Sequence, residues 1–381
     1  PQYPEFKELM KYANNLCHLL SNGECISEVG VLFHGEAEWS GEYMLTQVVA
    51  KELTTHQIGF EIVAGEYLKE GYLDKNTWNM NGQKIRGLIV PYAQYLPAEL
   101  LKTIHTMQNL GLPVYFIEGL PEGTSEGHMN DIVTDGKVIQ VNEIVSVLKE
   151  AGLQDLSVDT ASEKLRVYHY VNEGLHLYFF TNESSYERIT TNVSVKETGW
   201  IGIYDAFRDI LVQDDEGFKL DLPPYGSKVV IVASEPLTVQ KKKVSEYAWV
   251  EDLRSAEVVL IDFEGNRKEI SMDPLHYINT ISSTFSGRIV YTFEVYCEEN
   301  FEGKVVVNGA IEGIRVSLND KEWGVRICPD YVFEVSFEKG LNTLVVEANT
   351  TLARSMNDFI SQYVPLSPTG IKGVSIYRKI L

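Results

Sequence analysis

The sequence predicts a multidomain protein in which an α/β domain is followed by all-β domains. Between residues 26 and 155, short apolar segments alternate with helical patterns, which indicates a parallel, doubly wound sheet covered by helices. From residue 156 onward, the spacing of apolar residues changes from the 3.6-residue period of a helix to the two-residue period of a strand. The length of 381 residues is enough for about two to four domains.

Residues 1–25 are predicted to form a linker helix. Apolar residues recur at spacings of three and four from Phe6 to Leu20, and the polar residues 21–24 end this pattern. The chain has no initiator methionine and no signal peptide, and it begins like an internal segment of a longer protein. We therefore expect a parent protein whose N-terminal part is missing here.

Residues 26–155 are predicted to form the α/β domain. Its apolar strands are expected at Val29–Phe33, Phe60–Val63, 85–91 and 111–119. Its helices are expected at Tyr43–Leu53, 97–110 and Val141–Ala151. The order of these elements resembles that of a flavodoxin-like domain.

The remainder of the chain is predicted to form two β domains. Residues 156–235 contain short strands and turns, including two strands around an Asn-Glu-Gly turn, and predict a small antiparallel β domain. A polar connector with three consecutive lysines begins near residue 234, and this charge run is interpreted as a solvated link. Strand patterns at intervals of about 8–12 residues then predict a β-sandwich or jelly roll over residues 236–381.

The charge and cysteine content exclude several classes of function. The net charge of −21 repels phosphate groups, so neither nucleic acid nor an anionic membrane is expected as a partner. The sequence lacks the run of about 18 apolar residues that a membrane-spanning helix needs. None of the four cysteines forms a CxxC pair, so no metal site is predicted, and reduced thiols favour a cytoplasmic location.

The loop after the first strand is the main candidate site. In open α/β sheets, ligands bind outside the carboxyl ends of the strands, and this loop places His34, Glu36, Glu38 and Trp39 there. Trp39 offers an apolar ring on which a sugar could stack. These four residues are predicted to line a substrate cleft. The alternative for each is a purely structural role in the loop.

No catalytic residue is assigned to this loop. Glycoside hydrolysis needs two carboxyl groups on opposite sides of the sugar, and Glu36 and Glu38 are near neighbours in one short loop. A flavin or nucleotide is not predicted either, because Glu36, Glu38 and Glu42 would repel its phosphate group. The sequence therefore predicts no cofactor.

A family resemblance appears in residues 316–354. The segment contains a strand that ends in an Asn-Asp turn, a later aromatic-rich strand, the pattern Gly-x-Asn-x-Leu-x-Val-Glu and a closing Asn-Thr. The residues that carry this pattern are Asn319, Asp320, Gly324, Tyr331–Phe333, Gly340–Asn342, Leu344, Val346, Glu347, Asn349 and Thr350. This segment resembles the galactose-binding-like, sugar-binding jelly roll of family 2 glycoside hydrolases. Asp320 stands where glycine is usual, which predicts a different type of hairpin turn.

The first 44 residues resemble the region after the catalytic barrel in a group of large bacterial glycosidase-like proteins. In that group the barrel is followed by a flavodoxin-like domain, a small β domain and a family 2 type sugar-binding domain. A similar arrangement occurs in family 42 β-galactosidases, whose second domain aids trimerisation and contributes to the active-site mouth. The resemblance implies two partners for this chain, a carbohydrate and a missing N-terminal catalytic domain.

The jelly roll supplies a second set of candidate residues. Trp323, Asp330 and Tyr331 are predicted to form a platform for a glycan, with core and turn positions as the alternative. Arg354 and Asp358 lie in a long loop between strands, and they are predicted to contact a glycan or a neighbouring domain.

The sequence therefore predicts an accessory, non-catalytic C-terminal part of a bacterial glycoside hydrolase. Its expected role is to scaffold the barrel, shape the substrate cleft and hold glycan. Two alternatives are a stand-alone carbohydrate-binding protein and a module that assembles the parent enzyme into a homo-oligomer. The sequence selects neither a sugar nor a linkage.

Overall fold

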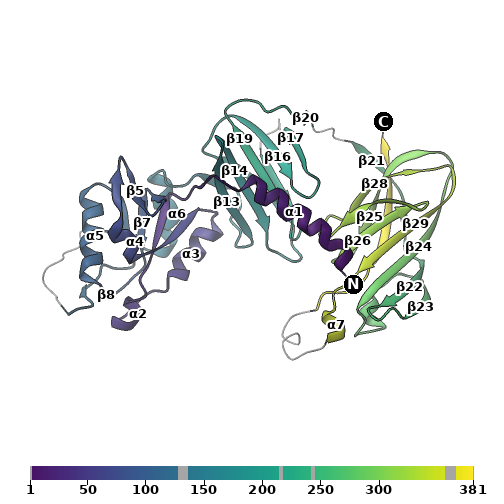
Figure 1. Cartoon of the computed structure of the whole chain (residues 1–381), viewed down its shortest axis with the longest axis horizontal. Coiled ribbons are helices and arrows are strands. Elements are labelled where there is room, and N and C mark those ends of the chain that lie inside the picture. Colours follow the sequence, from purple (N-terminus) through teal and green to yellow (C-terminus); the bar gives the residue numbers. More distant parts are fainter. Residues whose placement is uncertain (1, 128–135, 214–217, 242–244, 357–365, 381) are drawn as a thin grey trace.

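The structure is a computed structural model that describes residues 2–127, 136–213, 218–241, 245–356 and 366–380. Three domains follow one another along the long axis of the molecule, and helix α1 runs across the middle domain toward the third (Figure 1). The combination of one parallel sheet with several antiparallel sheets confirms the predicted fold class.

The α/β domain is built on a parallel sheet with the strand order β11-β9-β7-β2-β3. Numbered along the chain within this sheet, the order is 2-1-3-4-5, which is that of flavodoxin-like domains. The strands are β2 (Val29–Phe33), β3 (Phe60–Ala64), β7 (Gly87–Val90), β9 (Val114–Ile117) and β11 (Lys137–Ile139). Four of them match predicted strands, whereas β11 was not predicted, because it has only three residues.

Helices cover both faces of this sheet, as its doubly apolar strands require. One face packs against α3 (Thr46–Thr55) and α6 (Ile144–Glu150), the latter preceded by a 3₁₀ turn at Val141–Glu143. The other face packs against α4 (Gly65–Glu70) and α5 (Ala98–Asn109).

An antiparallel insertion between β3 and β7 was not predicted. It consists of β4 (Tyr72–Asp74), β5 (Thr77–Met80) and β6 (Gln83–Ile85). Trp78 on β5 is buried, and its indole Nε1 donates a hydrogen bond to the carbonyl oxygen of Leu68 at 3.3 Å. The insertion thereby covers α4 and extends the core of the domain.

The middle domain pairs a seven-stranded sheet with a three-stranded sheet. The larger sheet has the order β1 (Glu24–Cys25), β13 (Leu165–Asn172), β14 (Leu175–Asn182), β19 (Ser227–Ala233), β16 (Trp200–Asp205), β17 (Ile210–Gln213) and β20 (Gln240–Lys241). The smaller sheet has the order β12 (Leu156–Val158), β15 (Ile189–Val195) and β18 (Lys219–Leu222). The sheet therefore takes in β1 from the linker segment and β20 from beyond the predicted limit at residue 235.

The third domain is a sandwich of two antiparallel sheets. One sheet has the order β21 (Glu246–Leu253), β30 (Gly373–Ile380), β25 (Phe301–Asn308) and β28 (Val332–Phe337). The other has the order β23 (Arg267–Met272), β22 (Ala256–Asp262), β24 (Gly287–Cys297), β29 (Gly340–Asn349), β26 (Gly313–Leu318) and β27 (Lys321–Arg326). Alternate residues of both sheets form one core between them.

The hairpin between β26 and β27 corrects one expectation. Leu318 pairs with Lys321, so Asn319 and Asp320 form a two-residue loop, and their φ angles are 50° and 62°. Two positive φ angles are the mark of a type I′ turn, which is the usual type for a two-residue hairpin. Asp320 therefore keeps the common turn type despite replacing glycine.

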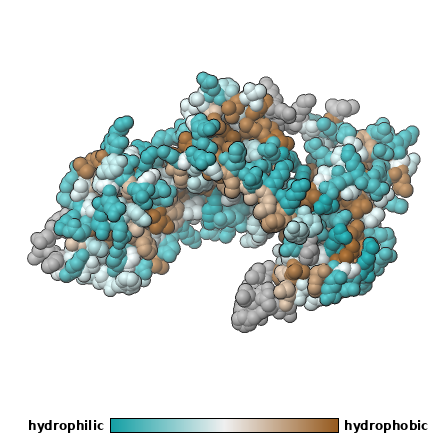
Figure 2. All heavy atoms as spheres, in the orientation of Figure 1, coloured by the Kyte–Doolittle hydropathy of each residue, from teal (hydrophilic) through white to brown (hydrophobic). Residues whose placement is uncertain are grey.

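The linker helix braces the two β domains. Glu5 ends a 3₁₀ turn (Tyr3–Glu5), and its Oε1 accepts a hydrogen bond from Asn349 Nδ2 of the sandwich at 2.7 Å. Helix α1 (Phe6–Leu19) then lies on the middle domain, where Tyr12 stacks on Phe207 with ring centroids 4.0 Å apart. Leucines of α1 pack against the same domain, and Figure 2 shows apolar atoms gathered over this middle part of the molecule.

Two further findings bear on the expectations from composition. The four cysteines are free thiols. Among the helices of the described residues, none has the length and apolar character that crossing a membrane requires.

Candidate functional site

The loop with the predicted substrate-lining residues follows β2 and lies where the strand order of the parallel sheet reverses. In that sheet β3 lies on one side of β2, whereas β7 and the later strands lie on the other. A reversal of this kind opens a crevice at the carboxyl ends of the two central strands, and ligands of open α/β sheets bind there. The loop forms a short helical turn, α2 (Ala37–Ser40), which begins with a hydrogen bond from the Ala37 amide to the His34 carbonyl oxygen at 2.9 Å.

His34 lies beneath this turn rather than on its surface. Its exposed fraction is 1%, and neither ring nitrogen reaches a hydrogen-bond partner among the described residues. Burial lowers the pKa of His34, although the backbone at His34 and Pro91 and the charges of Glu38 and Glu36 oppose this effect. The structure therefore corrects the expectation that the His34 side chain lines the cleft, since it supports the loop from below.

Glu36, Glu38 and Trp39 lie on the surface of the loop. All three are exposed, and Trp39 is 89% exposed. An indole ring that gains almost no burial from its own domain is available to a ligand or to another domain. The loop thus presents one aromatic platform beside two carboxylates.

Two neighbouring loops meet this one at the same edge of the sheet, and the sequence analysis did not single them out. The side chain of Gln94, which follows β7, accepts a hydrogen bond from the Glu42 amide at 3.1 Å and donates one to Glu122 at 2.9 Å. Burial, with the charges of Glu122 and Glu42, raises the pKa of Tyr92. The rule that ligands bind beyond strand ends could have identified Tyr92 and Gln94, because both follow the third apolar strand directly.

The aromatic candidates of the sandwich are largely covered. Tyr331 is 4% exposed and belongs to the core, so the structure corrects its expected role in a glycan platform. Trp323 is partly buried against the same core, and the Lys321 ammonium lies 3.9 Å from the centre of its ring. An aromatic ring already covered by a lysine offers little free surface to a sugar.

The charged candidates of the sandwich make contacts within the chain. Asp330 accepts hydrogen bonds from Arg188 Nη1 at 3.1 Å, and Arg188 also binds Asp221 through Nε at 2.7 Å. Because Arg188 and Asp221 belong to the middle domain, Asp330 ties the sandwich to that domain. Arg354 donates hydrogen bonds to Thr369 Oγ1 and to the Ser367 carbonyl oxygen, at 2.9 and 2.6 Å. Asp358 lies outside the described residues.

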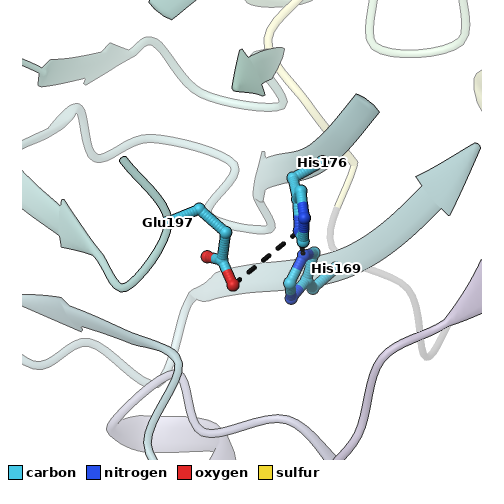
Figure 3. Close-up of side chains that lie close together, drawn as sticks. All are labelled: His169, His176 and Glu197. Atoms are coloured by element: carbon cyan, nitrogen blue, oxygen red, sulfur yellow. Dashed lines mark hydrogen bonds and ion pairs between the residues drawn. The ribbon is translucent and has the colours of Figure 1, made fainter. Parts of the chain in front are cut away.

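A partly buried polar network at the junction of the first two domains was not predicted. His169 on β13 and His176 on β14 lie side by side, and Glu197 approaches them from the loop after β15 (Figure 3). His169 Nε2 lies 3.0 Å from His176 Nδ1, and His176 Nδ1 lies 3.8 Å from Glu197 Oε1. On its other side, His169 Nδ1 lies 2.8 Å from Asp155 Oδ2.

The register of the hairpin explains why the two histidines meet. His169 pairs with Tyr178 across the strands, and His176 is two residues from Tyr178, so both imidazoles lie on one face. The predicted Asn-Glu-Gly turn, which has positive φ angles at Glu173 and Gly174, could have given this pairing. Asp155 and Glu197 come from other parts of the chain, and no local pattern places them here. Burial lowers the pKa of His176, an effect that the Glu197 charge opposes.

Comparison with solved structures gives a match that covers almost the whole chain. The chain is similar to the rhamnosidase from Novosphingobium sp. PP1Y, with a TM-score of 0.69 and 15% identity over 97% of this chain and 41% of that protein. It therefore spans about two fifths of the length of that rhamnosidase. No protein-family model matches the sequence, and no curated protein matches it either.

Two weaker matches belong to family 42 enzymes or to β-galactosidases. The β-galactosidase from Bacillus circulans sp. alkalophilus has a TM-score of 0.44 and 10% identity over 59% of this chain and 44% of that protein. The exo-carrageenase GH42 from Bacteroides ovatus has a TM-score of 0.39 and 12% identity over 54% of this chain and 29% of that protein. Of these matches, the one to the rhamnosidase shows that the chain shares its fold with part of a glycoside hydrolase structure.

Proposed function

We propose that this chain is the accessory, non-catalytic C-terminal part of a glycoside hydrolase. In this proposal a catalytic domain precedes it in the parent protein and carries the two carboxyl groups that cleave the glycosidic bond. The three domains described here hold that catalytic domain in place. The loop with Glu36, Glu38 and Trp39 completes the mouth of its substrate cleft.

The observation that carries the proposal is the similarity to a single rhamnosidase over 97% of the chain. A match of this extent takes in the parallel sheet, the middle domain and the sandwich together. Such a combination of three unlike domains is much more specific than any one of them, since each fold alone serves many functions. A rhamnoside is accordingly the first substrate to test.

The geometry of the loop supports the second part of the proposal. Trp39 is exposed at the carboxyl end of the sheet, where ligands of such domains bind, and the same loop carries the exposed residues Glu36 and Glu38. These charges disfavour phosphorylated ligands but are compatible with neutral sugars, whose hydroxyl groups donate hydrogen bonds to carboxylates.

The catalytic assignment is tested with the isolated chain and with the parent gene. The chain alone should not release the chromophore from aryl glycosides, including an aryl rhamnoside. The coding sequence before Pro1 should encode a domain with a pair of carboxylates at strand ends. Hydrolysis by the chain alone, abolished by Glu36→Gln or Glu38→Gln, would contradict the proposal.

The role of the loop is tested by Trp39→Ala in the parent enzyme. Loss of a stacking platform weakens substrate binding, so KM should rise while kcat changes little. Trp249→Ala is a matched control, because Trp249 is also exposed but lies on the sandwich. If both variants leave KM unchanged, Trp39 does not contact the substrate.

A further inference from the structure

The polar network between the first two domains has the composition and spacing of a metal site. His169 Nε2, His176 Nδ1 and one oxygen of Glu197 all lie within 4.8 Å of one another. In a tetrahedral zinc site, bonds of about 2.0–2.1 Å place neighbouring ligand atoms about 3.3 Å apart. The two imidazole nitrogens are 3.0 Å apart, close to this value, and Glu197 Oε1 lies 3.8 Å from His176 Nδ1. The other carboxylate oxygen of Glu197, Oε2, accepts a hydrogen bond from the Tyr178 hydroxyl, which leaves Oε1 for the metal.

Asp155 gives His169 the orientation that a metal ligand needs. Its carboxylate lies 2.8 Å from Nδ1, so that nitrogen carries the proton and Nε2 keeps a lone pair for a metal. Histidine ligands of metals almost always donate their other ring N–H to a carboxylate, a carbonyl or water. The Asp155–His169 pair therefore has the arrangement of a ligand and its supporting carboxylate.

The charge of the network also favours a cation. Asp155 and Glu197 each form an ion pair with a histidine, which is positive only when it is protonated. The network therefore places two carboxylates beside two imidazoles, a set of groups that attracts a divalent cation.

We propose that His169, His176 and Glu197 bind one divalent transition-metal ion of the zinc type, with Asp155 as the positioning residue. Two imidazoles and one carboxylate select such a metal over calcium or magnesium, which prefer oxygen ligands. His176 and Glu197 are about one third and one fifth exposed, so the ion has a path from solvent and a fourth position for water.

The consequence of binding is a firmer junction between the first two domains. Asp155 is the residue before β12, where the α/β domain ends, and its carbonyl oxygen accepts a hydrogen bond from the Lys196 amide at 2.8 Å. Glu197 follows directly. A metal held by Glu197 and the β13–β14 hairpin therefore fixes the loop that carries Lys196 and Glu197, and this loop is hydrogen-bonded to the end of the α/β domain.

The test uses the full chain after treatment with a chelator, followed by titration with Co²⁺ and Zn²⁺. We expect one equivalent of Co²⁺ with the intense visible bands of a tetrahedral site, and a higher melting temperature with Zn²⁺. His176→Gln and Glu197→Gln should each weaken binding at least tenfold, and Asp155→Asn should weaken it by about 10- to 100-fold. All three are conservative changes, and circular dichroism of the metal-free variants checks that they fold.

His105→Ala is the matched control, since this histidine is exposed on α5 and remote from the network in sequence. It should bind both metals like the unmodified chain. The proposal is overturned if the unmodified chain takes up no Co²⁺. It is equally overturned if His176→Gln and Glu197→Gln bind as tightly as His105→Ala, because binding would then reflect the acidic surface alone.

Discussion

Replacement of Glu312 by glutamine should stabilise the sandwich at neutral and alkaline pH. Glu312 lies between β25 and β26, and its Oε2 is buried without a hydrogen-bond partner among the described residues. Its Oε1 accepts only a long hydrogen bond, of 3.5 Å, from the Thr351 amide. Burial raises the pKa of Glu312 to about 7 from the usual 4.5, although the Thr351 amide and the charge of Arg354 oppose the shift.

The size and sign of the effect follow from this difference. Between pH 4.5 and 7 the folded chain binds the Glu312 proton more tightly than the unfolded chain does, so the free energy of unfolding falls as the pH rises. A shift of about 2.5 pH units corresponds to about 3 kcal/mol, which is lost in full above pH 7. Glu312→Gln removes the charge, so the free energy of unfolding of the variant should exceed that of the unmodified chain by about 3 kcal/mol at pH 8 and by about half as much at pH 5.5.

Hydrogen exchange measured by mass spectrometry reports this change in stability for the strands near Glu312. Peptides from β26 and β29 should exchange more slowly in the variant, and comparison of the two proteins at one pH removes the dependence of exchange chemistry on pH. Glu257→Gln is the control, because Glu257 is exposed on β22 of the same domain. If Glu312→Gln slows hydrogen exchange by the same factor at pH 5.5 and at pH 8, burial of the carboxylate does not control its titration.

Three further changes test other parts of the structure. His34→Leu removes a buried ring whose two nitrogens have no hydrogen-bond partner among the described residues, so it should raise the free energy of unfolding by about 1–3 kcal/mol in urea titrations. The gain should grow as the pH falls below 6.5, because burial lowers the pKa of His34. A lower free energy of unfolding in the variant would mean that the ring has a partner. Arg188→Ala breaks contacts to Asp221 and Asp330 that are nearly half exposed, so it should lower the free energy of unfolding by less than about 1 kcal/mol. It should nevertheless widen the distribution of distances between the domains in solution scattering. An unchanged scattering profile would refute a role of Arg188 at the joint between the middle domain and the sandwich. Phe333→Ala removes a fully buried side chain from the sandwich core, so it should lower the free energy of unfolding in urea titrations by about 3–5 kcal/mol. A loss below about 1 kcal/mol would argue against that core.

The sequence predicted the elements whose signal is local. The apolar strands of the parallel sheet and the pattern around Gly340 and Asn342 belong to this group. Asn342 is fully buried, and its Nδ2 donates hydrogen bonds to the carbonyl oxygens of Glu338 and Gly340 at 2.7 and 3.1 Å. Short strands such as β11 and β20 escaped prediction, because two or three residues carry no period.

The candidate site was predicted only in part, for a physical reason. A strand end can be located from the sequence, so the position of the His34–Trp39 loop was found. The direction of each side chain depends on packing by distant residues, which decides that His34 is buried and Trp39 exposed. The same limit applies to Asp330, whose ion pair with Arg188 joins residues far apart in the sequence.

The linker segment shows how such distant contacts determine the arrangement of the domains. Glu5 is bound to Asn349 of the sandwich, Tyr12 stacks on Phe207 of the middle domain, and β1 adds a strand to the middle sheet. Helix α1 begins directly after Glu5 and contains Tyr12, and its 14 residues span about 21 Å as a rigid helix. Because β2 begins soon after β1, the same segment sets where the parallel sheet starts relative to both β domains. The orientation of the Trp39 loop toward any neighbouring domain therefore depends on contacts made by residues 1–25, which the sequence analysis describes only as a linker.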